Sequence, residues 1–283
     1  MSVVSIIGAG EIGSATAYAL ARRSRVGAVR LVDAAGNVAA GKALDMRQSG
    51  PIEHFDTPIS ARGDVLDAVG ADVIVIADAH AEGEWEGERG LALIKQLVRA
   101  GSTAPIVCAG PKQVWLMEAA VREAGIHADR IVGSAASAVQ SGVRALAALE
   151  LNGSGVDVSV SVVGRAPGFT VGWTSATYAG SLLTGQIPAH RLLAISDMIK
   201  KMWPPRPQTI GAATAMVVEG LLTHSRRHVH ATTVLGGAVG GDGDRGVATM
   251  MPLELGEKQV LRHIEPSLST QERVEFLNGL SRR

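Results

Sequence analysis

The chain has 283 residues, of which 46% are hydrophobic, and its 27 Lys and Arg residues equal its 27 Asp and Glu residues. This length favours about two domains, each with its own core. The balanced charge creates no field that would attract nucleic acid or an anionic membrane, so we expect a small-molecule partner. Cys108 is the only cysteine, which excludes an internal disulfide and a cysteine-rich zinc motif.

The amino-terminal sequence MSVVSIIGAG has no basic segment before its short apolar run and leads directly into a glycine-rich turn. It is therefore typical of a first strand and not of a signal peptide. No apolar run is long enough for a transmembrane helix. We expect a cytoplasmic protein with no membrane partner.

A G-x-G-x-x-G motif separates this apolar run from a helix-like run. Gly8 permits a tight turn, and Gly10 lets the backbone approach a pyrophosphate because no Cβ is in the way. Gly13 lets the helix pack closely on the sheet. The N–H groups of the first helical turn, which includes Glu11 and Ile12, would face the phosphates.

An acid, Asp33, ends the second strand-like run, twenty residues after Gly13. A carboxylate there can accept hydrogen bonds from the ribose hydroxyls of NAD and would repel the additional phosphate of NADP. The motif and the acid together predict a dinucleotide site that uses NAD.

Strand and helix patterns then alternate along the first half of the chain. We predict further strands near residues 57–61, 72–77, 105–108 and 130–134, and helices over residues 36–50, 91–100 and 113–124, with Pro51 closing the first of these helices. This alternation predicts an α/β fold with a doubly wound parallel sheet of the Rossmann type.

From about residue 137 the pattern changes to a helix, a strand over residues 156–163, a glycine-rich stretch and further helices and strands. We predict a Rossmann domain over residues 1–136 and an α+β substrate-type domain over residues 137–283. Ser269 and Glu272 form a capping box that starts the last helix. Residues 236–246 are expected to form a loop or hairpin connection, and we predict no metal site there because the EF-hand spacing is absent.

The chain as a whole resembles the lactate/malate dehydrogenase family, in particular its lactate dehydrogenase-like malate dehydrogenase branch. The matching segments are IIGAGEIGSATAYAL, LVD, GKALDMRQSGPIEHFD, DRIVGSA and GVATMMPLELGEKQVLRHIEPSLSTQE. The resemblance implies a Rossmann fold, an NAD site and assembly into homodimers or homotetramers. It also implies a histidine acid/base held by an aspartate, and arginines that bind the substrate carboxylate.

The chain departs from that pattern at the positions of the family's chemistry. Arg165 stands in place of the histidine, and Gln140 in place of the aspartate that orients it. Val143 replaces the arginine that binds the carboxylate, and Gly110 replaces an asparagine near the nicotinamide. A guanidinium stays protonated near neutral pH and cannot accept the alcohol proton.

The family's cationic mobile loop corresponds here to AHAEGEWEGERG, residues 79–90. Four glutamates accompany one basic residue, Arg89, which matches the family's second loop arginine only if one residue is inserted. The glutamates repel an anionic substrate or are simply solvated. We expect Arg165 to pair with Glu84 or Glu86 of this acidic loop.

Two functions follow. In the first, the chain binds NAD(H) but no longer carries out the family's chemistry on malate or lactate. In the alternative, it is an active NAD-dependent dehydrogenase for a different small substrate, neutral or cationic, and another group transfers the proton. His80, after the strand at 72–77, is the best candidate for that group in the first domain, and Asp78 or a loop glutamate is the alternative. For His80 itself, a bystander loop histidine is the competing interpretation. The three histidines in HSRRHVH, residues 224–230, are expected on the surface.

Overall fold

The computed structural model describes residues 2–236 and 246–281. Six parallel strands form the expected doubly wound sheet in the order β3-β2-β1-β4-β7-β8. The strands are β1 (Val3–Ile7), β2 (Ala28–Val32), β3 (Ile59–Arg62), β4 (Val73–Ile76), β7 (Ile106–Cys108) and β8 (Ile131–Gly133). The strand order reverses between β1 and β4, which is where a sheet of this type binds its ligand.

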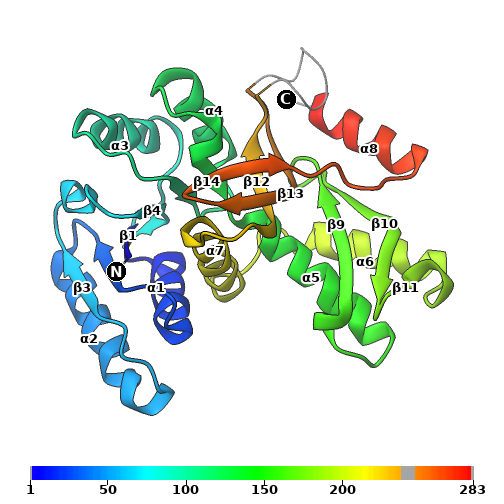
Figure 1. The fold of residues 1–283 in the computed structure, drawn as a ribbon, viewed down its shortest axis with the longest axis horizontal. Helices are drawn as coiled ribbons and strands as arrows, with labels where there is room; N and C mark the ends of the chain where they lie inside the picture. The colour runs from blue at the N-terminus through cyan, green and yellow to red at the C-terminus, as the bar shows by residue number, and fades with distance from the viewer. Residues whose placement is uncertain (1, 237–245, 282–283) are drawn as a thin grey trace.

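Helices cover both faces of the sheet (Figure 1). Side chains that alternate along each strand reach opposite faces, so Val4 and Ile6 belong to one core while Ile7 belongs to the other. The first core includes side chains of α1 (Glu11–Arg23), α2 (Gly36–Glu53) and α7 (Pro207–Leu222), and the second includes side chains of α3 (Gly87–Arg99) and α4 (Val114–Glu123).

Three antiparallel strands extend this sheet beyond β8. They are β12 (Arg227–Val234), β13 (Ala248–Gly256) and β14 (Gln259–His263), and the complete sheet has nine strands. The sheet therefore takes strands from both sides of the predicted boundary between residues 136 and 137, and that division stays a prediction. The loop expected at residues 236–246 lies almost entirely outside the described residues.

A second region has its own core, and Figure 1 shows it beside the sheet. It contains α5 (Ala135–Glu150), β9 (Val158–Val163), β10 (Thr170–Tyr178), β11 (Ser181–Leu182) and α6 (Ala189–Lys201). The last helix, α8 (Thr270–Ser281), begins with the expected capping box. Ser269 N donates to Glu272 Oε2 at 2.8 Å, and Glu272 N donates to Ser269 Oγ at 3.3 Å.

Short elements connect these parts. They are the 3-10 helices η1 (Val65–Ala68), η2 (Ala128–Arg130), η3 (Gly155–Asp157) and η4 (Leu183–Gly185), and the small strands β5 (Asp78–Ala79) and β6 (Gly83–Glu84). Helix α2 continues past Pro51 to Glu53, because a proline in the last turn interrupts few helical hydrogen bonds. Across residues 2–236 and 246–281, none of the helices has the length and apolar content needed to cross a membrane.

Candidate functional site

The glycine turn, residues 8–13, joins β1 to α1 and has the tight geometry that the motif predicts. Gly8 has a φ of +112°, and a Cβ there would lie 2.3 Å from the carbonyl oxygen of Asp78. A Cβ on Gly13 would lie 2.0 Å from the carbonyl oxygen of Gly8. Neither position can hold a side chain without displacing backbone atoms.

Lys42 of α2 also holds the glycine turn, although sequence reasoning assigned it no role. Its Nζ donates to the carbonyl oxygen of Ala9, to that of Gly10 at 3.4 Å and to Ser14 Oγ at 3.1 Å. An ammonium that pairs with these carbonyls fixes the turn from the side of α2. The segment GKALDMRQ, which carried much of the resemblance, contains this lysine.

Asp33 is buried at the end of β2, and its carboxylate accepts three backbone hydrogen bonds. The donors are the N–H groups of Ala9 at 2.7 Å, Ala35 at 2.9 Å and His80 at 2.9 Å. Asp33 therefore ties the glycine turn to the segment that follows β4. Its proposed contact with ribose hydroxyls would have to use the remaining acceptor capacity of the carboxylate.

The start of α1 faces Asp78, the first residue of β5. Asp78 Oδ1 accepts from Gly13 N at 2.9 Å, and Oδ2 accepts from Ile12 N at 3.2 Å. A Cβ on Gly10 would lie 2.3 Å from the Asp78 carboxyl carbon, and Glu11 at the first position of α1 is exposed. One of the donors expected to bind a pyrophosphate, the N–H of Ile12, is thus used by a side chain of the chain itself, together with the N–H of Gly13. In this conformation the glycine turn does not fit a bound pyrophosphate.

A cavity of about 340 Å³ lies beside Asp33, on the β2 side of the glycine turn. Its lining residues are Ile7, Gly8, Val32, Asp33, Ala34, Gly63, Asp64, Val65 and Trp85. In a doubly wound sheet the adenosine half of a dinucleotide lies next to the acid that ends the second strand. An open cavity therefore lies where the nucleoside is expected, whereas Asp78 occupies the place expected for the pyrophosphate.

The acidic loop folds into a short hairpin, β5 paired antiparallel with β6, which is followed by α3. Arg89 Nη1 lies 2.5 Å from Glu82 Oε2, and the Arg89 guanidinium lies 4.5 Å from the centre of the Trp85 ring. Arg89, in the first turn of α3, is thus bound to the segment that precedes its helix. The exposed side chain of His80 belongs to the same hairpin, and the His80 backbone N–H donates to Asp33 at 2.9 Å.

Glu84, at the other end of the hairpin, lies against the turn between β7 and α4. Its Oε2 accepts from Lys112 N at 3.0 Å and would lie 2.1 Å from a Cβ built on Gly110. Burial raises the pKa of the Glu84 carboxyl, although the hydrogen bond from Lys112 acts in the opposite direction. An asparagine at position 110 would collide with Glu84 as it is placed here.

The buried amide of Gln113, a second residue that sequence reasoning missed, connects the same turn to the hairpin. Gln113 Oε1 accepts from Gly110 N at 2.9 Å. Its Nε2 donates to the carbonyl oxygens of Ala77 at 3.2 Å and Trp85 at 3.0 Å. Each polar atom of this side chain has a partner, so the hairpin is held at its ends by internal hydrogen bonds.

Arg165, which follows β9, forms an ion pair with Glu118 of α4. Arg165 Nη1 lies 2.8 Å from Glu118 Oε1, which also accepts from Ala248 N at 2.9 Å. The expectation that Arg165 pairs with Glu84 or Glu86 is wrong, because Arg165 extends toward α4 while the hairpin packs against the turn that precedes that helix. A lone acid in the apolar sequence VWLMEAAV was the available signal for Glu118.

The remaining two positions at which the resemblance predicts a replacement lie on α5 and serve the second core. Gln140 Nε2 donates to the carbonyl oxygen of Val160 at 2.8 Å, which ties α5 to β9. Val143 is completely buried among apolar side chains of the same core. Neither side chain presents an ionic group to a ligand.

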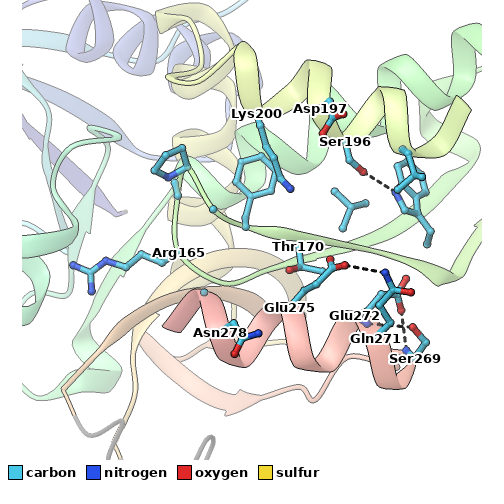
Figure 2. A pocket seen from close by; sticks show the side chains of 18 of the residues that line it. Arg165, Thr170, Ser196, Asp197, Lys200, Ser269, Gln271, Glu272, Glu275 and Asn278 are labelled. Carbon is cyan, nitrogen blue, oxygen red and sulfur yellow. Dashed lines mark hydrogen bonds between the residues drawn. The ribbon is translucent and has the colours of Figure 1, made fainter. Parts of the chain in front are cut away.

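A cavity of about 930 Å³ lies between β10, α6 and α8 (Figure 2). Polar side chains from all three elements line it, among them Asp197, Lys200 and Glu275. Arg165 borders this cavity, but Figure 2 shows its guanidinium directed away from the other labelled side chains. The cavity is thus separate from the ion pair of Arg165.

The histidine cluster expected on the surface is divided between exposed and buried positions. His228 is exposed on β12, whereas His230, two residues later on the same face of the strand, is largely buried because β12 becomes more buried toward its carboxyl end. Burial and the nearby charge of Arg144 lower the pKa of His230 to about 4. Within the part of the chain that the structure describes, no three His, Cys, Asp or Glu side chains are grouped to hold a metal.

Comparison with known proteins agrees with this fold. Residues 2–99 match the family described as lactate/malate dehydrogenase, NAD binding domain. Malate dehydrogenase of Anoxybacillus flavithermus is 30% identical over 298 aligned positions, which cover 98% of this chain and 94% of that protein. The match confirms the expected family and, at the level of the family, the expected cofactor, NAD.

Solved structures show the same fold over nearly the whole chain. A minor L-lactate dehydrogenase from Enterococcus mundtii has a TM-score of 0.87 at 19% identity, covering 99% of this chain and 95% of that one. Lactate dehydrogenase from Cryptosporidium parvum, complexed with lactic acid and the dinucleotide, has a TM-score of 0.86 at 19% identity, with 99% and 96% covered.

Proposed function

Because the chain belongs to the lactate/malate dehydrogenase family, we propose that it binds NAD(H) but does not oxidise malate or lactate at an appreciable rate. The observation that carries the proposal is the ion pair between Arg165 and Glu118 at the position where the family resemblance implies a histidine acid/base. A guanidinium held by a carboxylate has no vacant acceptor atom for the proton that the alcohol must lose.

The neighbouring positions support the same conclusion. Oxidation of a 2-hydroxy acid needs an acceptor for the proton and a cation for the substrate carboxylate, in addition to a hydride acceptor. Gln140 is used to hold β9, and Val143 offers only an apolar side chain. Arg89, the one basic residue of the acidic loop, pairs with Glu82. We infer that this chain lacks both the acid/base and the carboxylate site of the family.

We also propose that the chain forms a homodimer or homotetramer, as the resemblance implies. Large apolar side chains on α2 support an association surface, since Leu44 and Ile52 are 53% and 77% exposed. Light scattering coupled to size-exclusion chromatography checks this, and a monomer at micromolar concentration would contradict it.

The function is tested by measuring cofactor binding and turnover separately. NADH at about 100 times its dissociation constant should stabilise the fold by about 2.7 kcal/mol, which is measurable as an increase in Tm. Reduction of oxaloacetate and pyruvate by NADH should remain at the background rate. Fast reduction of either keto acid would contradict the proposal, and turnover of only a neutral or cationic substrate would support the alternative dehydrogenase function.

Asp33→Ala is the variant that links binding to the predicted site. Removal of this carboxylate should decrease the Tm shift caused by NADH and reduce the preference for NADH over NADPH. Because Asp33 also accepts three backbone hydrogen bonds, the ligand-free Tm of the variant must be measured alongside. An unchanged preference between NADH and NADPH would show that Asp33 does not contribute to cofactor binding.

A further inference from the structure

One hairpin places a carboxylate on each side of the point where the strand order of the sheet reverses. Asp78 in β5 lies at the start of α1, after β1, and Glu84 in β6 lies at the start of the turn after β7. A dinucleotide crosses the carboxyl ends of these strands, with its pyrophosphate at the first helix. Both carboxylates therefore lie along the path that the dinucleotide would take.

The contact of Asp78 is the more specific of the two. Its two carboxylate oxygens accept from two successive N–H groups of α1, at 3.2 Å from Ile12 and 2.9 Å from Gly13. Its carboxyl carbon lies 2.3 Å from where a Cβ of Gly10 would be, so it occupies the space that the absent side chain leaves. The positive end of the helix dipole is thus neutralised by the chain's own anion.

We infer that Asp78 is an internal substitute for the pyrophosphate and that it determines how tightly the chain binds NAD(H). The N–H groups of Ile12 and Gly13 cannot donate to the Asp78 carboxylate and to a phosphate at the same time. A phosphate at the start of α1 would also be repelled by the carboxylate, because both groups are anions. A dinucleotide therefore binds only the fraction of molecules in which Asp78 has left the glycine turn. This inference rests on the proposed function, since it concerns the affinity of the same site.

Hydrogen bonds donated by backbone N–H groups hold Asp78 and its hairpin in place, and they form without a bound dinucleotide. His80 N donates to Asp33 at 2.9 Å, and Gly10 N donates to the carbonyl oxygen of Asp78 at 2.8 Å. The apparent dissociation constant rises in inverse proportion to the fraction of molecules with a free turn. If about one molecule in ten has a free glycine turn, Asp78 lowers the affinity for NAD(H) about tenfold.

The cavity next to Asp33 predicts that ligands with and without phosphate respond differently to a substitution of Asp78. It lies on the β2 side of the glycine turn, is lined by Val32, Gly63 and Val65, and is open in the same conformation. A ligand with no phosphate can enter it without displacing Asp78. Adenosine should therefore be insensitive to the identity of residue 78, whereas ADP and NADH should be sensitive to it.

The experiment measures dissociation constants of NADH, ADP and adenosine by calorimetry for the wild type and Asp78→Ala. We expect NADH and ADP to bind the variant at least tenfold more tightly and adenosine to change less than twofold. Glu82→Gln is the matched control, because it removes a charge from the same hairpin while Glu82 contacts Arg89 and not the glycine turn. This control should change all three constants less than twofold.

A second variant, Asp78→Asn, covers the case in which the alanine variant does not fold, since it keeps the size of the side chain and one acceptor oxygen. It too should bind ADP and NADH more tightly than the wild type does. Equal NADH affinity in the wild type and the folded Asp78 variants, or equal tightening of adenosine and ADP, would overturn the inference while the proposed function stands. No NADH binding by any of the proteins would overturn both.

Discussion

The glycine turn and the four replaced positions, 110, 140, 143 and 165, differ in the atoms on which their roles depend. The turn works through backbone geometry, and a side chain on Gly8 or Gly13 would meet backbone atoms within 2.3 Å. At the four positions, a catalytic role depends on side-chain chemistry. Here the side chains at positions 143, 140 and 165 serve packing, hydrogen bonding within the fold and an ion pair, and position 110 is a glycine.

Under the proposed function, this difference shows which features of an enzyme a fold can retain without the reaction. The glycine turn also joins β1 to α1, so its geometry is needed for folding whether or not a cofactor binds. A catalytic side chain usually contributes little to stability and can be replaced by one that contributes more. Substitutions in the two regions test whether the glycine turn acts through its backbone geometry and the four positions through their side chains.

The largest effect is expected in the glycine turn. Gly13→Ala should lower the free energy of unfolding by about 3 kcal/mol or more, equivalent to a Tm decrease of about 6 °C or more, because the new Cβ meets the carbonyl oxygen of Gly8. Gly41→Ala in exposed α2 is the control. No atom lies within 4 Å of a Cβ at position 41, and alanine should stabilise that helix by about 0.5–1 kcal/mol. Similar Tm values for the two variants would contradict the role of Gly13.

The ion pair of Arg165 should have the next largest effect. Glu118→Ala should cost about 2 kcal/mol in urea unfolding, because it leaves a half-buried guanidinium and the N–H of Ala248 without their acceptor. A double-mutant cycle with Arg165→Met isolates the pair, and the coupling should be favourable. Zero coupling would mean that the pair does not explain the replacement at position 165.

A smaller, pH-dependent effect is expected at Glu84. Burial raises the pKa of its carboxyl in the folded chain, so both states are protonated below the ordinary glutamate pKa and stability is lost as the pH rises through the raised value. Glu84→Gln avoids that loss and should raise Tm more at pH 8 than at pH 4, by less than the Glu118 variant lowers it. An equal shift at both pH values would show that ionisation of Glu84 is not the cause.

The smallest effect concerns activity. Arg165→His alone should leave oxaloacetate reduction at the wild-type background, because the new imidazole would have neither an aspartate at position 140 nor an arginine at position 143. Groups that act together in one mechanism recover little activity one at a time. Substantial turnover by this single variant, measured as NADH oxidation, would show that position 165 alone separates this chain from an active dehydrogenase.

The sequence by itself determined the doubly wound sheet, because hydrophobic alternation and glycine spacing are local properties that the backbone must obey. The positions of Gly8 and Gly13, the acid at position 33 and the capping box at Ser269 could all be recognised in this way. That Arg165 and Gln140 replace the family's histidine and aspartate stays a prediction from the resemblance, and the sequence did not indicate the partners of these two residues. Those partners lie 47 and 20 positions away along the chain, and no local pattern connects them.

Only the tertiary structure decided what the acidic loop does. Asp78 is 65 positions from Gly13, and the contact between them exists because the parallel strands β1 and β4 end side by side. The order β7-β4-β1-β2 in the sheet likewise brings His80 to Asp33 and Glu84 to the turn after β7. Parallel strands join distant segments at one edge of a sheet, so the anion at the start of α1 follows from strand order and not from the spacing of residues along the chain.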